Sequence, residues 1–171
     1  MENNHELALS EIKQLLQSNN QIETLKAMKA IGSKGEQAIP ILRETIRSND
    51  DLSLKTIAVV VVGEIGKGAI SAVPDLITQL KGTDEQLRMA ASLSLVRIGK
   101  GSISHLKDTL LQTEDENTLF WCSWALALID ASELSKESIS ILMHKEKHTD
   151  NIIEKTASQE ALAKVIGNTL K

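Results

Sequence analysis

The sequence predicts an all-α fold, an α-solenoid of about five helix pairs that forms a single domain over residues 1–171. Similar segments recur along the chain with a nearly constant spacing, within the range of periods that indicates stacked units of supersecondary structure. Apolar residues make up 42% of the chain but aromatic residues only 2%, so the core must consist of Leu, Ile, Val and Ala. Nine Gly and two Pro are too few for a loop-rich β protein. These observations together favour short helices packed closely against one another.

The repeat is clearest in the middle of the chain. Residues 65–75 (IGKGAISAVPD) align with residues 98–108 (IGKGSISHLKD) without a gap. Residues 31–42 align in the same way with residues 65–76, through a shared Ile-Gly and a shared Ala-x-Pro-x-Leu. Weaker copies follow toward the C-terminus. Each copy is long enough for two helices, and no linker or low-complexity segment divides the chain.

Proline marks the start of the first helix in two of the units. Pro40 and Pro74 fall in the first turn, where the missing amide proton costs no hydrogen bond. The spacing predicts first helices over residues 6–17, 37–48, 70–81, 102–112 and 135–147.

The second helix of each unit carries a stronger pattern. Within residues 87–98, small and apolar side chains at 87, 90, 91, 94, 95 and 98 follow the i, i+3, i+4, i+7 spacing of a buried helical face. Asp84 stands where an N-cap is expected, and Gly99 supplies the positive-φ residue that ends a helix. The same reasoning predicts second helices over residues 20–31, 51–65, 84–98, 116–129 and 150–167.

Composition limits the classes of partner and compartment. The net charge is −4, without the basic bias typical of general nucleic-acid binders, so no nucleic-acid partner is expected. The single Cys122 cannot form an internal disulfide, which fits a reducing compartment. The polar N-terminus is unlike a signal peptide, and the longest apolar run, residues 57–63, is far shorter than a membrane span. We therefore expect a cytoplasmic protein with no membrane partner.

The units resemble the HEAT-repeat family, and most closely its short PBS-lyase HEAT-like repeats. Residues 69–99 match this pattern almost throughout, with Arg88 near the start of the second helix and a terminal Ile-Gly. Residues 38–66 also match, whereas the fourth unit has Trp121 and Cys122 in place of the usual small pair. The resemblance implies a right-handed α-solenoid in which the second helices line the concave surface. It is specific for the fold rather than for a function, because unrelated proteins share this repeat.

The resemblance implies several functions. We expect a non-enzymatic protein–protein interaction module, an adaptor or regulatory scaffold that binds a peptide or helix of a protein partner in its concave groove. One alternative is a bilin lyase-like or phycobilisome-associated protein, which absorbance in the bilin region after mixing with chromophore would distinguish. A less favoured alternative is a HEAT-like DNA glycosylase, which would use Trp and basic residues on the concave face. The net charge of −4 argues against that enzyme.

Partner-binding residues are expected at the non-core positions of the second helices, with Arg88 near one edge. That stripe is small, apolar and nearly uncharged, unlike a solvated helix face. Phe120, Trp121 and Trp124 hold all the aromatic rings of the chain. They either enlarge the core of a shorter unit or form a binding hot spot. The candidate partner-binding residues are Thr56, Val59, Met89, Ser92, Val96, Phe120, Ser123, Trp124 and Arg88.

No catalytic, cofactor or metal site is expected from the motifs. His144 and His148 can share a helix face, but no third ligand is evident, so we expect a solvated helix end. The glycines within residues 63–68 would close a helix rather than open one, which excludes a phosphate-binding loop. Cys122 is expected to be a small buried residue rather than a nucleophile.

Two acid–base pairs are expected at the starts of second helices. Asp51 with Lys55, and Asp84 with Arg88, have the i, i+4 spacing of side chains that meet on a helix. We expect these pairs to be structural, combining an N-cap with a local ion pair that fixes the stacking of the units.

Overall fold

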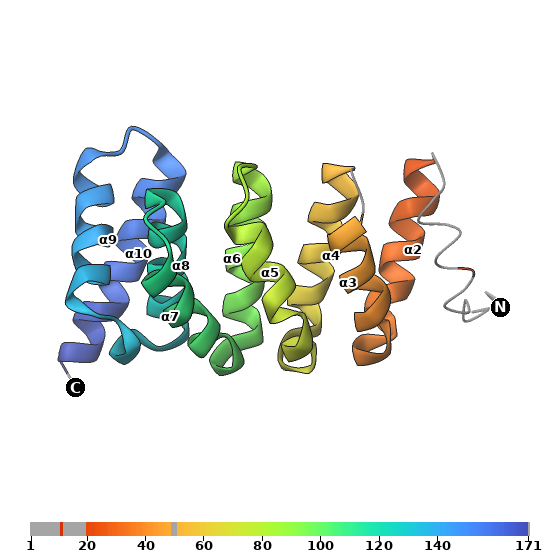
Figure 1. The fold of residues 1–171 in the computed structure, drawn as a ribbon, viewed down its shortest axis with the longest axis horizontal. Coiled ribbons are helices and arrows are strands. Elements are labelled where there is room, and N and C mark those ends of the chain that lie inside the picture. Colours follow the sequence, from red (N-terminus) through yellow and green to blue (C-terminus); the bar gives the residue numbers. More distant parts are fainter. Residues whose placement is uncertain (1–10, 12–19, 49–50, 171) are drawn as a thin grey trace.

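The structure is a computed structural model that describes residue 11, residues 20–48 and residues 51–170. Every regular element in this described part is a helix, so the predicted all-α class is confirmed (Figure 1). The predicted helix over residues 6–17 lies outside the described residues apart from residue 11. The other predicted boundaries agree with the observed ones to within about one helical turn.

The helices follow one another along the chain through short connections. The α-helices are α2 (Gln21–Ser33), α3 (Ile39–Ser48), α4 (Leu52–Ile65), α5 (Val73–Leu80), α6 (Glu85–Ile98), α7 (Ile103–Gln112), α8 (Glu116–Asp130), α9 (Lys136–His148) and α10 (Ile152–Thr169). Short 3-10 segments join some of them, namely η1 (Gly35–Ala38), η2 (Gly66–Ala72), η3 (Gly99–Ser102) and η4 (Ala131–Glu133).

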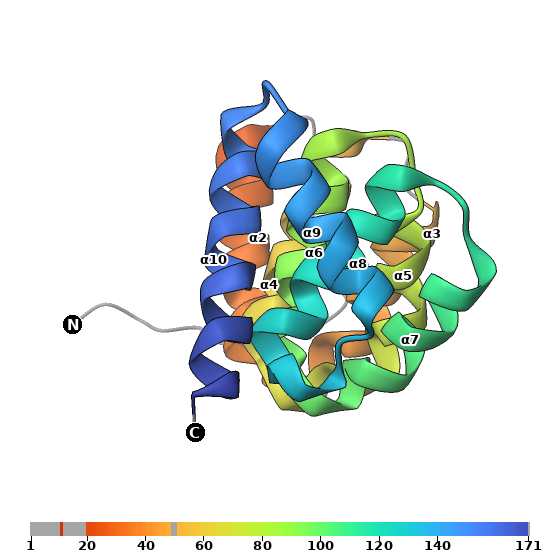
Figure 2. The same cartoon turned by 90° about the vertical axis from the view of Figure 1, so that its left-hand side faces the viewer.

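The helices are arranged in pairs. Each odd-numbered helix packs against the even-numbered helix that follows it, from α3 with α4 to α9 with α10. Neighbouring even-numbered helices also pack together, in the order α2, α4, α6, α8 and α10, so the pairs stand in a row (Figure 1). Figure 2 looks along this row and shows α2, α4 and α10 on one side and α3, α5 and α7 on the other. We call the side formed by α2, α4, α6, α8 and α10 the even-numbered layer.

A polar N-cap begins each helix of the even-numbered layer. In each case a side-chain oxygen of the cap accepts a hydrogen bond from a backbone amide in the first turn of the helix. The caps of α2, α4, α6, α8 and α10 are Asn20, Asp51, Asp84, Asp115 and Asn151, respectively. These bonds satisfy amides that have no acceptor within the helix. The five caps stand at equivalent points, so positions on neighbouring helices can be compared by counting from the cap.

Glycine ends α4 and α6. Gly66 has φ 66° and Gly99 has φ 81°, in the left-handed region that favours glycine. The prediction that Gly99 ends a helix is therefore confirmed, and so is the prediction that the glycine-rich segment closes one. Pro40 and Pro74 are the second residues of α3 and α5, where the missing amide proton costs no hydrogen bond.

Leu52–Leu80 is the one stretch of helical residues in the described part that is long and apolar enough to cross a membrane by composition. Gly66 and η2 divide this stretch into α4, with 14 residues, and α5, with 8 residues. Each helix is shorter than the roughly 20 residues that a membrane span requires. The cytoplasmic location stays a prediction.

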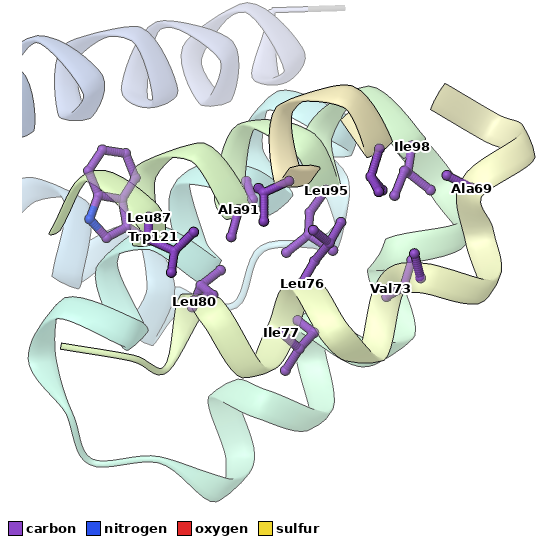
Figure 3. Packing of buried hydrophobic residues seen from close by; sticks show 14 of the residues in the cluster. Ala69, Val73, Leu76, Ile77, Leu80, Leu87, Ala91, Leu95, Ile98 and Trp121 are labelled. Carbon is purple, nitrogen blue, oxygen red and sulfur yellow. The ribbon is translucent and has the colours of Figure 1, made fainter. Parts of the chain in front are cut away.

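The core runs through the row and consists mainly of aliphatic side chains. Figure 3 shows its middle, where Leu76 and Leu80 of α5 lie against Leu87 and Leu95 of α6, with Trp121 of α8 beyond them. All five side chains are buried. The composition therefore predicts the chemistry of the core correctly, with the aromatic residues of α8 as the exception.

Gly63 lies where α4 packs against α6 and is a buried contact point. A Cβ atom at this position would lie 2.6 Å from Ser94 Oγ and 3.0 Å from Ser94 Cα. The hydroxyl of Ser94 is itself fixed, because it donates to the Val59 carbonyl at 2.9 Å. No signal in the repeat pattern indicates that α4 and α6 approach each other this closely at Gly63.

We expect Gly63→Ala to lower the free energy of unfolding by about 1–2 kcal/mol, because the added methyl group forces α4 and α6 apart. Urea unfolding followed by circular dichroism measures the change. Gly167→Ala is the matched control, because Gly167 lies in α10 with no neighbouring atom within 4 Å of the added methyl. That variant should be unchanged or stabilised by about 0.5 kcal/mol through better helix propensity. Equal effects of the two substitutions would contradict the close approach at Gly63.

Candidate partner-binding groove

A groove of about 390 Å³ lies on the even-numbered layer near the C-terminal end of the row. Side chains of α6 and α10 form its walls, and two tryptophans of α8 form its floor. We call it the tryptophan groove. It is lined by Met89, Leu93, Trp121, Trp124, Ile152, Ile153, Thr156, Ala157 and Glu160.

The walls of the groove are large apolar side chains that face solvent. Met89 is 37% exposed and Leu93 is 40% exposed on α6, while Ile152 and Ile153 are 72% and 51% exposed on α10. Single exposed apolar residues are common on protein surfaces, but a contiguous group around a concavity is typical of interaction sites. Among the described residues, Glu160 is the only ionisable one that lines the groove.

The floor of the groove contains two buried indole N–H groups. Trp121 and Trp124 pack edge to face, with ring centroids 5.4 Å apart and an angle of 82° between the ring planes. Neither indole nitrogen has a hydrogen-bond acceptor within the described part of the chain. A buried donor without an acceptor costs about 1–3 kcal/mol.

The predicted partner-binding residues divide into two groups. Met89 and Trp124 line the groove. Thr56 and Val96 are half-buried and lie outside it. The exposure predicted for the remaining five is wrong, because these side chains are buried: Val59, Arg88, Ser92, Phe120 and Ser123.

For three of these residues, the predicted exposed face of the helix is displaced by one residue from the observed one. Val59, Ser92 and Ser123 face neighbouring helices, whereas the residue after Ser92, Leu93, is exposed. The hydroxyls of Ser92 and Ser123 donate to carbonyls of their own helices, at Met89 and Leu119. They are therefore satisfied without a partner.

Phe120 is buried because α8 is covered from more than one side. Its ring meets Trp121 edge to face at a centroid distance of 4.9 Å. Lys145 of α9 places its Nζ atom 5.6 Å from the Phe120 centroid and also binds Glu154 at 3.1 Å. The aromatic cluster therefore enlarges the core, one of the two predicted alternatives, while Trp121 and Trp124 also form the floor of the groove.

Arg88 binds its own chain rather than facing a partner. Its Nη2 donates to the Gly82 carbonyl at 2.5 Å, and its Nε donates to the Leu80 carbonyl at 3.2 Å. Its Nη1 pairs with Glu85 at 2.9 Å. Asp84 caps α6 as predicted, but the predicted ion pair of Arg88 with Asp84 is replaced by the pair with Glu85. Arg88 thus holds the connection between α5 and α6, which corrects its assignment as a binding residue.

Six groove residues were missed by sequence reasoning: Leu93, Ile152, Ile153, Thr156, Ala157 and Glu160. Counting from the N-caps would have found part of the set. Leu93 and Glu160 each stand at the ninth position after a cap, as Trp124 does. Ile152 and Ile153 follow Asn151 directly, and no signal in the repeat pattern distinguishes them as exposed.

The structure places the residues that were considered for chemistry as follows. Burial raises the pKa of the Cys122 thiol to about 12, so it stays protonated at neutral pH. The rings of His144 and His148 stack with centroids 4.4 Å apart at the end of α9. The described residues contain no group of three or more His, Cys, Asp or Glu side chains arranged to hold a metal ion.

Comparison with known proteins gives one relative and no family description. No family model matches the chain. The chain is 36% identical over 169 residues to the uncharacterized protein SkfG of Bacillus subtilis (strain 168). The match covers 99% of this chain and 96% of that protein.

Proposed function

The chain belongs to the same family as SkfG, and we propose that it is a non-enzymatic interaction module that holds an apolar segment of a protein partner in the tryptophan groove. The observation that carries this proposal is the exposure of Met89, Leu93, Ile152 and Ile153 around one concavity. Covering these side chains removes apolar surface from water, which stabilises a complex by about 25 cal/mol for each Å² of apolar area buried.

The orphaned indole groups support a peptide as the occupant. A polypeptide carries a carbonyl acceptor at every residue, so a bound segment can offer acceptors to Trp121 and Trp124 in several registers. Tryptophan is also enriched among the residues that dominate binding energy at protein interfaces. The Cys122 thiol is buried and its pKa is raised to about 12, so it offers no thiolate nucleophile to such a segment.

We propose further that the row of helix pairs is a right-handed α-solenoid of HEAT-like repeats. Three features support it: the recurring sequence segments, the pairing of each odd-numbered helix with the next helix, and the contacts between successive even-numbered helices. In this proposal the even-numbered layer is the concave face.

The test is a selection of peptides from a phage-displayed library, followed by affinity measurements on synthetic copies. We expect the wild-type protein to enrich peptides with several large apolar residues. The double variant Met89→Glu/Leu93→Glu should bind the best peptide at least about tenfold more weakly, since two charges then face the apolar segment. Fluorescence anisotropy measures both affinities.

Leu111→Glu is the matched control, because Leu111 is 86% exposed on α7 and does not line the groove. It should leave the affinity unchanged, and the urea midpoints of both variants establish that they are folded. Undiminished binding by the groove variant would overturn the proposed function, as would an equal loss in the Leu111 variant.

A further inference from the structure

Equivalent positions on the even-numbered layer form a row that crosses the tryptophan groove. The row contains the residue at the ninth position after the N-cap of each helix. From α2 to α10 these residues are Lys29, Val60, Leu93, Trp124 and Glu160. Since consecutive helices of this layer pack together, consecutive members of the row are on neighbouring helices.

The row is apolar in the middle and oppositely charged at its ends. Val60 and Leu93 are 39% and 40% exposed, and Trp124 lies in the groove floor. Lys29 and Glu160 are both exposed. Neither of them forms an ion pair with any other part of the described chain.

The charges next to these two residues do not cancel the pattern. Lys26, one turn before Lys29, is exposed and adds positive charge at the same end of the row. Lys164 is exposed one turn beyond Glu160, but it does not line the tryptophan groove, whereas Glu160 does. A segment that continues from the groove along this row therefore meets a carboxylate at the α10 end and an amine at the α2 end.

We propose, on the basis of the proposed function, that the partner is an amphipathic helix bound in one direction, with a basic residue against Glu160 and an acidic residue against Lys29. Packed helices lie about 8–10 Å apart, and a helix rises about 1.5 Å per residue. The partner helix therefore presents one apolar residue about every five to seven positions to Val60, Leu93 and Trp124. Opposite charges at its two ends fix its direction, since the reversed helix places like charges together.

The probe for this proposal is the best peptide from the selection, extended to about 25 residues so that a helix of this length spans the row. Two altered copies are made, one with its basic end changed to Glu and one with its acidic end changed to Lys. We expect the first change to weaken binding to the wild-type protein about three- to fivefold and to be rescued by Glu160→Lys. The second change should be rescued in the same way by Lys29→Glu.

Glu146→Lys is the matched control, because it makes the same change of charge on α9, outside the groove. It should rescue neither altered peptide. If the Met89→Glu/Leu93→Glu variant loses binding but either rescue fails, the directional helix is overturned and the proposed function stands. If that variant binds as the wild-type protein does, both proposals fall together.

Discussion

Arg88→Met is expected to lower the free energy of unfolding by about 2–4 kcal/mol, because it leaves buried carbonyl groups without donors. The Arg88 side chain is only 6% exposed and donates to the carbonyls of Leu80 and Gly82. Leu80 is the last residue of α5, where carbonyls have no amide partner within the helix and carry partial negative charge. Methionine fills similar space but donates no hydrogen bond. Urea unfolding monitored by circular dichroism measures the loss.

Arg97→Met is the control for this prediction. Arg97 stands near the end of the same helix, but its ion pair with Glu64 is exposed at both residues. Exposed pairs contribute up to about 1 kcal/mol, so the loss should be correspondingly small. Arg88→Lys should fall between the two, because a single ammonium group cannot reproduce the planar fork of the guanidinium. A loss at Arg88 no larger than that at Arg97 would contradict the structural role of Arg88.

The helix boundaries could be predicted from the sequence because they are set by local interactions. Asp84 caps α6 through amides of its own first turn, and Gly99 ends α6 through its own backbone conformation. Because similar residues recur in neighbouring repeat units, the same boundaries are predicted there. The same local reasoning explains why Cys122 was correctly expected to be buried, since it stands on the apolar face of α8.

The candidate site could be predicted only in part, because it depends on contacts between residues far apart in the chain. Whether Ser92 or Leu93 faces solvent depends on how α6 is rotated against its neighbours. The close approach of Gly63 in α4 to Ser94 in α6 is one of the contacts that fix this rotation. Arg88 was misassigned for a different reason: its acceptors are near in sequence, at the end of α5 and in the connection that follows, but the repeat pattern does not show that its side chain turns back toward them. The repeat pattern identifies the layer, but not the line of residues that is exposed within it.

Asp75→Ala is expected to lower the free energy of unfolding by about 2–3 kcal/mol, since it removes a buried carboxylate that joins two helix pairs. Asp75 in α5 is buried, and its two oxygens accept from Arg43 Nε at 2.6 Å and from Arg47 Nε at 2.5 Å. Both arginines belong to α3, which otherwise touches α5 at only a few residues. Asp108 stands at the equivalent repeat position but is exposed, so Asp108→Ala should change the stability by less than about 0.5 kcal/mol.

A double-mutant cycle separates the link between α3 and α5 from other effects of losing Asp75. The Arg43 side chain is 29% exposed and that of Arg47 is 57% exposed, so solvent screens the second pair more strongly. We therefore expect a coupling energy of about 1–2 kcal/mol between Asp75→Ala and Arg43→Met, and a smaller one with Arg47→Met. Equal stability losses at Asp75 and Asp108, or no coupling to either arginine, would show that apolar packing alone holds neighbouring pairs together. The predicted order of the couplings follows from exposure, because both hydrogen bonds have nearly the same length.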